Sequence, residues 1–180
     1  MIVGWMLRES NNVIAEDLAR QVALRTRRPA SFSGGAAAVT AVLARLGVRH
    51  GVHLVDGSGL SPLDRLTPAA LAAVVRLAAV GQQHALRAAI TGMPVAGFSG
   101  TLAPGQSVFG SFGPPALGMV RAKTGNLGTV ASLSGIATDA SGHVLAFAFM
   151  ADKIAKGSQL ASAAGTIDAM ATALARCGCR

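Results

Sequence analysis

The chain has 180 residues, of which 51% are hydrophobic, and its mean hydropathy is +0.48. A chain of this length buries about 70% of the surface that its unfolded form exposes, so a single domain with an apolar core is expected. The net charge of +8 suits an anionic partner, but only 4% of the residues are aromatic and none is tyrosine. The stacking platforms of single-strand nucleic-acid binders are missing, so we expect no nucleic acid as a partner.

The sequence shows no targeting or membrane segment. The apolar run before Arg8 is too short for the central region of a signal peptide and its cleavage site, so no export signal is expected in this chain. No uncharged apolar run reaches the length of about eighteen residues that a membrane-spanning helix needs. Cys177 and Cys179 lie two positions apart, a spacing that rarely meets disulfide geometry, so we expect no function for them, with metal binding as the alternative.

The N-terminal part of the chain is expected to be helical. Residues 1–9 have the pattern of the tail of a helix or strand already under way, and residues 10–12 are good N-cap candidates for the helix that follows. Residues 27–29 end that helix. A second helix begins near Ser33 and closes at Gly47 in the left-handed conformation.

The middle of the chain mixes short elements with a long irregular segment. Residues 52–55 predict a short strand, and Thr67 followed by proline predicts the start of a helix. A second short helix is expected over 83–90. Residues 91–118 are rich in Gly, Pro and Ser and are interpreted as a long surface loop, which in a compact domain is often functional.

The C-terminal part changes character. Residues 119–123, 129–138 and 143–151 predict three consecutive antiparallel strands, and a closing helix capped by Ser158 follows. The hexapeptide 121–126 is interpreted as a cationic turn at the end of the first strand. We therefore expect a mixed α/β (α+β) fold with an antiparallel sheet flanked by helices.

Lys-Thr-Gly at a strand end is part of the signature of penicillin-recognising serine acyl enzymes. It arises by chance in roughly 2% of chains of this length, so it needs further motifs. Four segments in order resemble the penicillin-binding D-alanyl-D-alanine carboxypeptidase/endopeptidase family of the S13 type. They cover about residues 8 to 152 and are Ser10-Asn11-Asn12, Asp56 to Ser61 with Arg65, Pro94 to Gly97 followed by Gly100 to Leu102, and Lys123-Thr124-Gly125.

The resemblance implies a β-lactamase/transpeptidase-like acyl-transfer fold. It also implies an extracytoplasmic enzyme that acts on peptidoglycan stem peptides in the cell wall or periplasm and is acylated by β-lactam antibiotics. It implies no cofactor and no metal. His50 and His53 stand without a nearby cysteine or carboxylate cluster, so a zinc site is not expected there either.

The resemblance assigns catalytic roles to three residues. Ser10 relays a proton with Lys123, and Asn12 holds the substrate amide or a catalytic lysine. Taken singly, Ser10 is more often a plain helix cap and Lys123 a solvated surface charge. Asn12 could be a second cap residue.

Three further residues receive substrate-binding roles by the same resemblance. Thr124 contacts the terminal carboxylate, Gly125 belongs to the same motif, and the backbone N–H of Asn126 supplies half of the oxyanion hole. Asn126 departs from the family, where Thr or Ser is more usual, and this puts a hydroxyl contact to the carboxylate in doubt.

The nucleophile of the family lies in Ser-x-x-Lys, and this sequence contains none. The residues three before its lysines are Val120, Met150 and Lys153. Residues 1–180 are therefore expected to be the C-terminal part of one penicillin-binding transpeptidase-like domain, inactive in isolation, which needs the N-terminal portion of the same enzyme as its partner. The alternative is a non-catalytic cell-wall or partner-binding module with the same fold.

Overall fold

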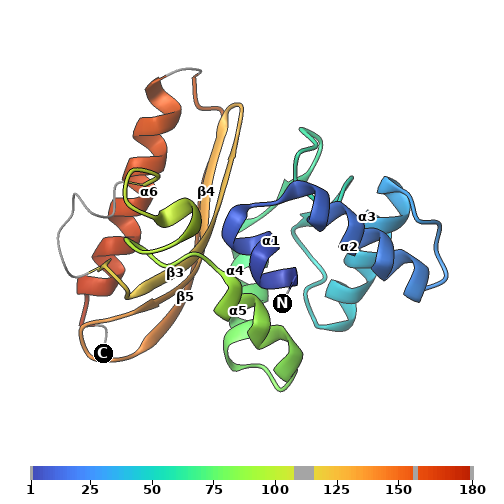
Figure 1. Cartoon of the computed structure of the whole chain (residues 1–180), viewed down its shortest axis with the longest axis horizontal. Helices are drawn as coiled ribbons and strands as arrows, with labels where there is room; N and C mark the ends of the chain where they lie inside the picture. Colours follow the sequence, from blue (N-terminus) through green and yellow to red (C-terminus); the bar gives the residue numbers. More distant parts are fainter. Residues whose placement is uncertain (1, 108–115, 156–157, 179–180) are drawn as a thin grey trace.

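The computed structural model describes residues 2–107, 116–155 and 158–178. A three-stranded antiparallel sheet stands near the middle of the molecule, with one long helix on one face and a group of helices on the other (Figure 1). The N-terminal helices extend away from the sheet. The prediction of an antiparallel sheet flanked by helices is confirmed.

The first three helices follow the predicted order. They are α1 (Ile2–Glu9), α2 (Asn12–Arg25) and α3 (Phe32–Arg45). The N-cap of α2 is Asn11, whose side chain accepts a hydrogen bond from the Ile14 backbone N–H at 3.0 Å. The serine of the predicted cap region is therefore not the cap.

A small hairpin precedes the next helix. Strands β1 (Val52–His53) and β2 (Arg65–Leu66) pair antiparallel, and only the first of them was predicted. Helix α4 (Pro68–Val80) begins as expected, with the Thr67 hydroxyl accepting from the Ala70 N–H. A strand of two residues carries too little periodic pattern to be recognised from sequence.

The predicted short helix over 83–90 is a 3₁₀ turn, η1 (His84–Leu86), that continues into α5 (Arg87–Gly92). Helix α1 lies against α5, and a Cβ added at Gly92 would come within 2.7 Å of the Gly4 Cα atom. This backbone-to-backbone approach fixes α1 close to the rest of the molecule.

Residues 91–118 are not a surface loop over the part that the structure describes. Pro94 and Leu102 are fully buried, and Leu102 ends a second 3₁₀ turn, η2 (Gly100–Leu102). The carbonyl of Pro94 accepts from the Ala122 N–H at 3.0 Å, so this segment runs along the first strand of the sheet. Residues 108–115 lie outside the described part.

The sheet has the order β3-β4-β5, with β3 (Val120–Leu127), β4 (Val130–Thr138) and β5 (Val144–Ala151). All three strands were predicted, but the prediction of a turn at 121–126 is wrong. Pairing continues to Leu127 opposite Val130, because the reversal takes place at the two residues between them. The Lys-Thr-Gly motif thus lies inside an edge strand.

Helix α6 (Ser158–Arg176) covers one face of the sheet and α4 packs on the other (Figure 1). The predicted apolar stripe of α6 is confirmed at Ile167 and Ala171, which are buried against Leu133 of β4. The capping contact predicted for Ser158 lies outside the described side chains. This core holds β3 rigidly from one side.

The C-terminal tail differs from expectation. Cys177 is disulfide-bonded, so the spacing argument against a disulfide is wrong for this residue, and Cys179 lies outside the described part. The same side chain therefore has no free thiol for a metal. Across the described ranges, no helix has the length and apolar character to cross a membrane.

Candidate active site

The structure joins the serine of the first motif to the lysine of the last. Lys123 Nζ donates a hydrogen bond to Ser10 Oγ at 2.8 Å, although the two residues are 113 positions apart in the sequence. Ser10 lies between α1 and α2, and Lys123 lies in β3. The predicted pair is therefore assembled by the fold and not by local sequence.

Two local features direct Ser10 toward the strand. Ser10 has a φ of 53°, in the left-handed region that non-glycine residues seldom adopt, so the chain turns sharply between the two helices. The end of α1 is held against η2, since a Cβ added at Gly100 would collide with the carbonyl oxygen of Arg8. Asn11 caps α2, which leaves the hydroxyl of Ser10 for Lys123.

Lys123 makes two short polar contacts and one long one, and burial has removed much of its hydration. Besides Ser10 Oγ, its ammonium donates to the backbone carbonyl of Thr124 at 2.6 Å and reaches Thr124 Oγ1 at 3.5 Å. Burial lowers the pKa of Lys123 from 10.5 to about 8, because the charged form loses solvation. An amine with this pKa exchanges protons readily near neutral pH.

Thr124 is held by a residue to which the sequence assigned no role. Its Oγ1 donates to Thr101 Oγ1 at 2.9 Å. Thr101 lies in η2, within one of the four segments that carry the family resemblance. The signal was present as Gly100-Thr101-Leu102, but nothing in the sequence indicated that this hydroxyl would meet the strand.

The two remaining substrate-binding candidates continue along β3. The Gly125 carbonyl accepts from Ser132 Oγ at 3.0 Å. Asn126 is exposed and lies, with Thr124, on the wall of a cavity of about 450 Å³ between β3 and α6. Lys123 of β3 thus contacts Ser10, whereas Thr124 of the same strand lines the cavity between β3 and α6.

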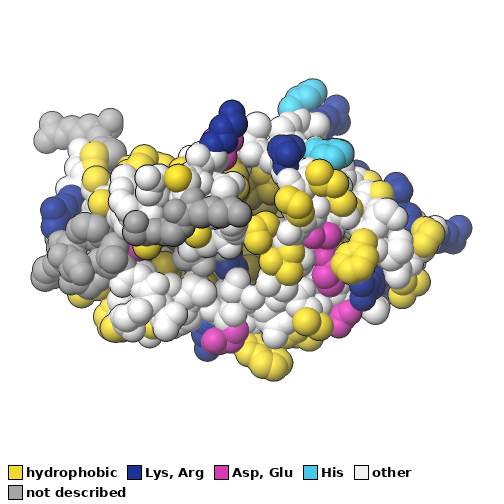
Figure 2. Space-filling model, turned by 90° about the horizontal axis from the view of Figure 1, so that it is seen from above, with side chains coloured by type: hydrophobic (Ala, Val, Ile, Leu, Met, Phe, Trp, Pro, Cys, Tyr) yellow, Lys and Arg dark blue, Asp and Glu magenta, His cyan; other side chains and the backbone are white. Residues whose placement is uncertain are grey.

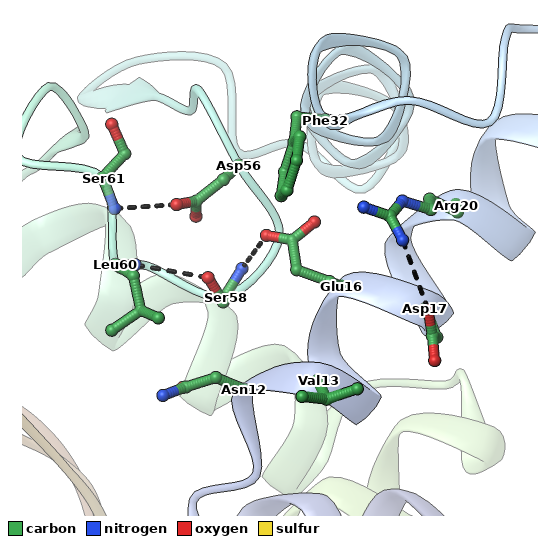
Figure 3. A pocket seen from close by; sticks show the side chains of 10 residues that line it. All are labelled: Asn12, Val13, Glu16, Asp17, Arg20, Phe32, Asp56, Ser58, Leu60 and Ser61. Atoms are coloured by element: carbon green, nitrogen blue, oxygen red, sulfur yellow. Dashed lines mark hydrogen bonds and ion pairs between the residues drawn. The ribbon is translucent and has the colours of Figure 1, made fainter.

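Asn12 is not brought into contact with the Ser10–Lys123 pair. Within the described residues its amide makes no hydrogen bond to either side chain, and the helix cap is Asn11. Asn12 lines another cavity of about 500 Å³, and in Figure 3 its side chain points away from Glu16. Its amide is thus not used as a cap.

The cavity of about 500 Å³ that Asn12 lines contains a buried carboxylate, which we did not predict from the sequence. Glu16 Oε1 accepts from the backbone N–H groups of Gly57 at 2.7 Å and Ser58 at 2.9 Å (Figure 3). A Cβ at Gly57 would collide with Ala19, so only glycine lets the loop approach α2 this closely. The available signal was the position of Glu16, three residues before buried Ala19 on the same helix face.

The loop itself, residues 56–61, is closed by Asp56. Its Oδ1 accepts from the Gly59 N–H at 2.6 Å and its Oδ2 from the Ser61 N–H at 2.7 Å. Among the residues that the structure describes, no three His, Cys, Asp or Glu side chains gather as a metal site. The assembled groups place a partly desolvated ammonium, that of Lys123, beside the hydroxyl of Ser10.

Comparison with known proteins gives a consistent assignment. Residues 1–176 match the D-Ala-D-Ala carboxypeptidase 3 (S13) family. Carboxypeptidase DacB of Mycolicibacterium smegmatis is 43% identical over 175 residues, which cover 97% of this chain and 37% of that protein. D-alanyl-D-alanine carboxypeptidase DacB of Haemophilus influenzae is 38% identical over 146 residues, which cover 79% of this chain and 29% of that protein.

Solved structures agree with these relatives. Penicillin binding protein 4 from Haemophilus influenzae superimposes with a TM-score of 0.80 at 31% identity, covering 98% of this chain and 39% of that chain. The same protein in complex with a β-lactam gives a TM-score of 0.78. The chain spans about 37% of the length of its Mycolicibacterium relative. By the match over residues 1–176, this chain belongs to the D-Ala-D-Ala carboxypeptidase 3 (S13) family.

Proposed function

We propose that this chain is the C-terminal part of a serine D-Ala-D-Ala carboxypeptidase that acts on peptidoglycan stem peptides outside the cytoplasm. The observation that carries the proposal is the hydrogen bond from Lys123 Nζ to Ser10 Oγ at 2.8 Å. The nucleophilic serine and its lysine come from a portion outside this sequence. The chain alone is then inactive, and Ser10, Asn12 and Lys123 complete the site.

In this proposal, Ser10 and Lys123 deliver a proton to the leaving amine. When the nucleophilic oxygen attacks the carbonyl of the penultimate D-Ala, the C–N bond breaks and the departing amine needs a proton. Ser10 Oγ–H donates that proton to the amine and takes one from the Lys123 ammonium. The lowered pKa of Lys123, about 8, supports the role, because the ammonium gives up its proton at modest cost.

Asn12 has a separate role in the proposal. Its amide is not the helix cap, and the residue lies two positions after Ser10 in the sequence. It holds either the substrate amide or the catalytic lysine of the portion outside this chain.

The strand supplies the substrate-binding groups. The Thr124 hydroxyl and the Lys123 ammonium bind the terminal carboxylate, and Gly125 leaves room for Ser132 of β4, whose Oγ a Cβ atom there would approach to 2.5 Å. The Ala122 N–H points away from β4, toward Pro94 O, and backbone direction alternates along a strand. The N–H of Asn126 therefore points to the same open edge, which supports its role as half of an oxyanion hole.

The outer edge of β5 supports a second portion of the same enzyme as the partner. Within the described residues β5 pairs only with β4, and its eight residues, VLAFAFMA, include neither charge nor proline. An unprotected apolar edge recruits a further strand. A strand from the N-terminal portion, added here, would complete the sheet.

Covalent labelling tests the proposal. The chain is mixed with the N-terminal portion of its Mycolicibacterium relative and with penicillin, and adducts are measured by mass spectrometry. An adduct on the serine of that portion, dependent on Lys123, is expected. The chain alone gives none, and an adduct on Ser10 would overturn the role given to it. Lys153, an exposed lysine with a φ of 56°, provides the control variant Lys153→Gly.

A non-catalytic cell-wall or partner-binding module is the second candidate. It is favoured by the net charge of +8 and by the absence of Ser-x-x-Lys from the sequence. Peptidoglycan sedimentation at rising salt concentration distinguishes the two, since charge-driven retention falls with salt. Retention that survives Lys123→Met, together with no acyl adduct in the mixture, would favour the module.

A further inference from the structure

We propose that Ser132 of β4 is a positioning residue. Its hydroxyl holds the peptide unit between Gly125 and Asn126 in the orientation that turns the Asn126 N–H toward the open edge of β3. The orientation of this peptide unit is a property of the chain itself. The use of the N–H to stabilise an oxyanion rests on the proposed function, and separate measurements test the two.

Ser132 and Gly125 lie directly opposite each other in the antiparallel pair of β4 and β3. Ser132 Oγ donates a hydrogen bond to the Gly125 carbonyl oxygen at 3.0 Å. That carbonyl belongs to the same peptide unit as the N–H of Asn126. Because a peptide unit is planar and trans, its C=O and N–H point in opposite directions. A hydroxyl that holds the carbonyl toward β4 therefore holds the N–H away from β4.

The hydroxyl of Ser132 occupies the space that a side chain at position 125 would need. A Cβ atom added at Gly125 would lie 2.5 Å from Ser132 Oγ. Positions two apart in a strand share one face of the sheet, so this space is on the face that carries the Lys123 side chain. Glycine at position 125 and serine at position 132 thus fit each other on the side of the sheet where Lys123 meets Ser10.

The rest of the structure restrains this peptide unit little. Val120 and Ala122, earlier in β3, are fully buried in the core, whereas Asn126 is exposed. Among the described residues, backbone hydrogen bonds on the outer side of β3 end with the one from the Ala122 N–H to the Pro94 carbonyl. Glycine also gives the backbone more freedom than any other residue. The end of the strand therefore needs a further restraint, and the hydroxyl on β4 supplies it.

A donor on the carbonyl also strengthens the N–H of the same peptide unit. Hydrogen bonds in series polarise one another, by roughly 10–30% per bond. An oxyanion hole acts through N–H groups that are aimed before the reaction begins. Ser132 therefore adds both direction and strength to the Asn126 N–H, without contact with the substrate.

The peptide unit that Ser132 holds lies beside accessible space. Thr124, Asn126 and Ser132 all line the cavity of about 450 Å³. Seen from above, the surface is hollowed between the part of the molecule that carries the sheet and the part that carries the N-terminal helices (Figure 2). A ligand can thus approach the end of β3 without displacing the core.

Ser134 offers a matched control on the same strand. It lies two positions from Ser132, on the same face of the sheet, and pairs with Lys123 in the ladder. No hydrogen bond from its hydroxyl is found within the part of the chain that the structure describes. The two serines therefore differ in the one contact that carries the proposal, the hydrogen bond to the Gly125 carbonyl.

The first measurement uses the full chain and NMR. The residual dipolar coupling of the Asn126 N–H reports the direction of that bond, and the carbonyl ¹³C shift of Gly125 reports its hydrogen bond. Ser132→Ala is expected to change both, whereas Ser132→Thr, which keeps a hydroxyl, and Ser134→Ala should retain the original values. Unchanged couplings in α6 show that the variants are folded. An unchanged Asn126 coupling in Ser132→Ala would overturn the proposal.

The second measurement is the rate of acylation by penicillin in the mixture with the N-terminal portion of the Mycolicibacterium relative. Ser132→Ala is expected to lower the limiting rate constant about tenfold and to leave the apparent affinity unchanged. The loss is smaller than the roughly 10²–10³-fold effect of removing an oxyanion donor, because the N–H itself remains. Ser132→Thr should recover most of the rate. A purely structural serine would instead change the fraction of folded chain.

The two measurements also separate this proposal from the proposed function. If the unmodified chain gives no adduct in the mixture, the proposed function fails, and the dipolar coupling still decides whether Ser132 sets the direction of the N–H. If the unmodified chain and Ser132→Ala are acylated at the same rate, the role of Ser132 is wrong and the proposed function stands.

Discussion

Lys123 and Glu16 are both mostly buried charges held by backbone groups, yet their surroundings differ. The ammonium of Lys123 has its donors engaged by Ser10 and Thr124. The carboxylate of Glu16 has one oxygen bonded twice and the other without a partner among the described residues. The two buried charges thus differ in how completely the described residues satisfy them.

The comparison also separates two sources of rigidity. Lys123 is placed by an edge strand that is packed against a core of fully buried side chains. Glu16 is placed by a helix that carries a loop. Substitutions at Lys123 should therefore change the rate of acylation more than the free energy of unfolding. Substitutions at Glu16 should change the free energy of unfolding more than the rate of acylation.

The largest expected effect belongs to Lys123→Met. In the mixture with the N-terminal portion, the rate of acylation by penicillin should fall by about 10²–10⁴-fold, because the proton relay to the leaving group is lost. The thermal midpoint should not fall, since a desolvated charge is replaced by an apolar chain of similar length. Mass spectrometry and calorimetry on the same sample check both parts, with Lys153→Gly as the control.

The second effect is a dependence of stability on pH. Burial lowers the folded-state pKa of Lys123 from 10.5 to about 8, so between these values the unfolded chain binds more protons than the folded one. The free energy of unfolding should rise with pH across that interval, on the order of 1–3 kcal/mol, and level off above it. Urea titrations at several pH values measure this, and in Lys123→Met the rise should disappear.

The third effect concerns the stability role of Glu16. Glu16→Ala leaves the N–H groups of Gly57 and Ser58 without their acceptor and should cost about 1–3 kcal/mol of unfolding free energy. Glu16→Gln retains an acceptor and should cost less than half as much. Chemical denaturation measures both, and equal losses in the two variants would show that charge, and not the loop anchor, stabilises this region.

The smallest effect is expected at Thr101. Thr101→Val removes the oxygen that accepts from Thr124, which frees that hydroxyl to turn away from the substrate carboxylate. Penicillin acylation should weaken by about 3–10-fold through the binding term, the size of one net hydrogen bond. A fall in the limiting rate with unchanged apparent affinity would instead indicate a role beside Lys123.

Much of the fold and part of the site followed from the sequence. Thr67 before proline, and the alternating strands of the sheet, depend on local rules that tertiary contacts did not override. The pairing of Ser10 with Lys123 came from a family resemblance, since no local rule connects positions 113 apart.

The misses have physical causes. Polar residues at 123–126 suggested a turn, but β3 lies at the edge of the sheet, where one side of a strand is not paired with a neighbouring strand and polar residues are tolerated. We predicted that the segment around Pro94 lies on the surface, because it is rich in glycine and proline. Its contact with β3 buries it instead, and this contact cannot be recognised from the local sequence. Glu16 was overlooked because a charged residue in a helix is normally solvated, and only the approach of Gly57 shows otherwise.

The left-handed backbone at Ser10 restricts which sequences this position can accept. Glycine fits the backbone but lacks the hydroxyl, whereas threonine has the hydroxyl but a β-branched side chain that suits this conformation poorly. A saturation library at this codon, sorted first for folding and then for acylation, should give two unequal survivor sets. Glycine, asparagine and aspartate should pass the first sort, and serine alone should pass both.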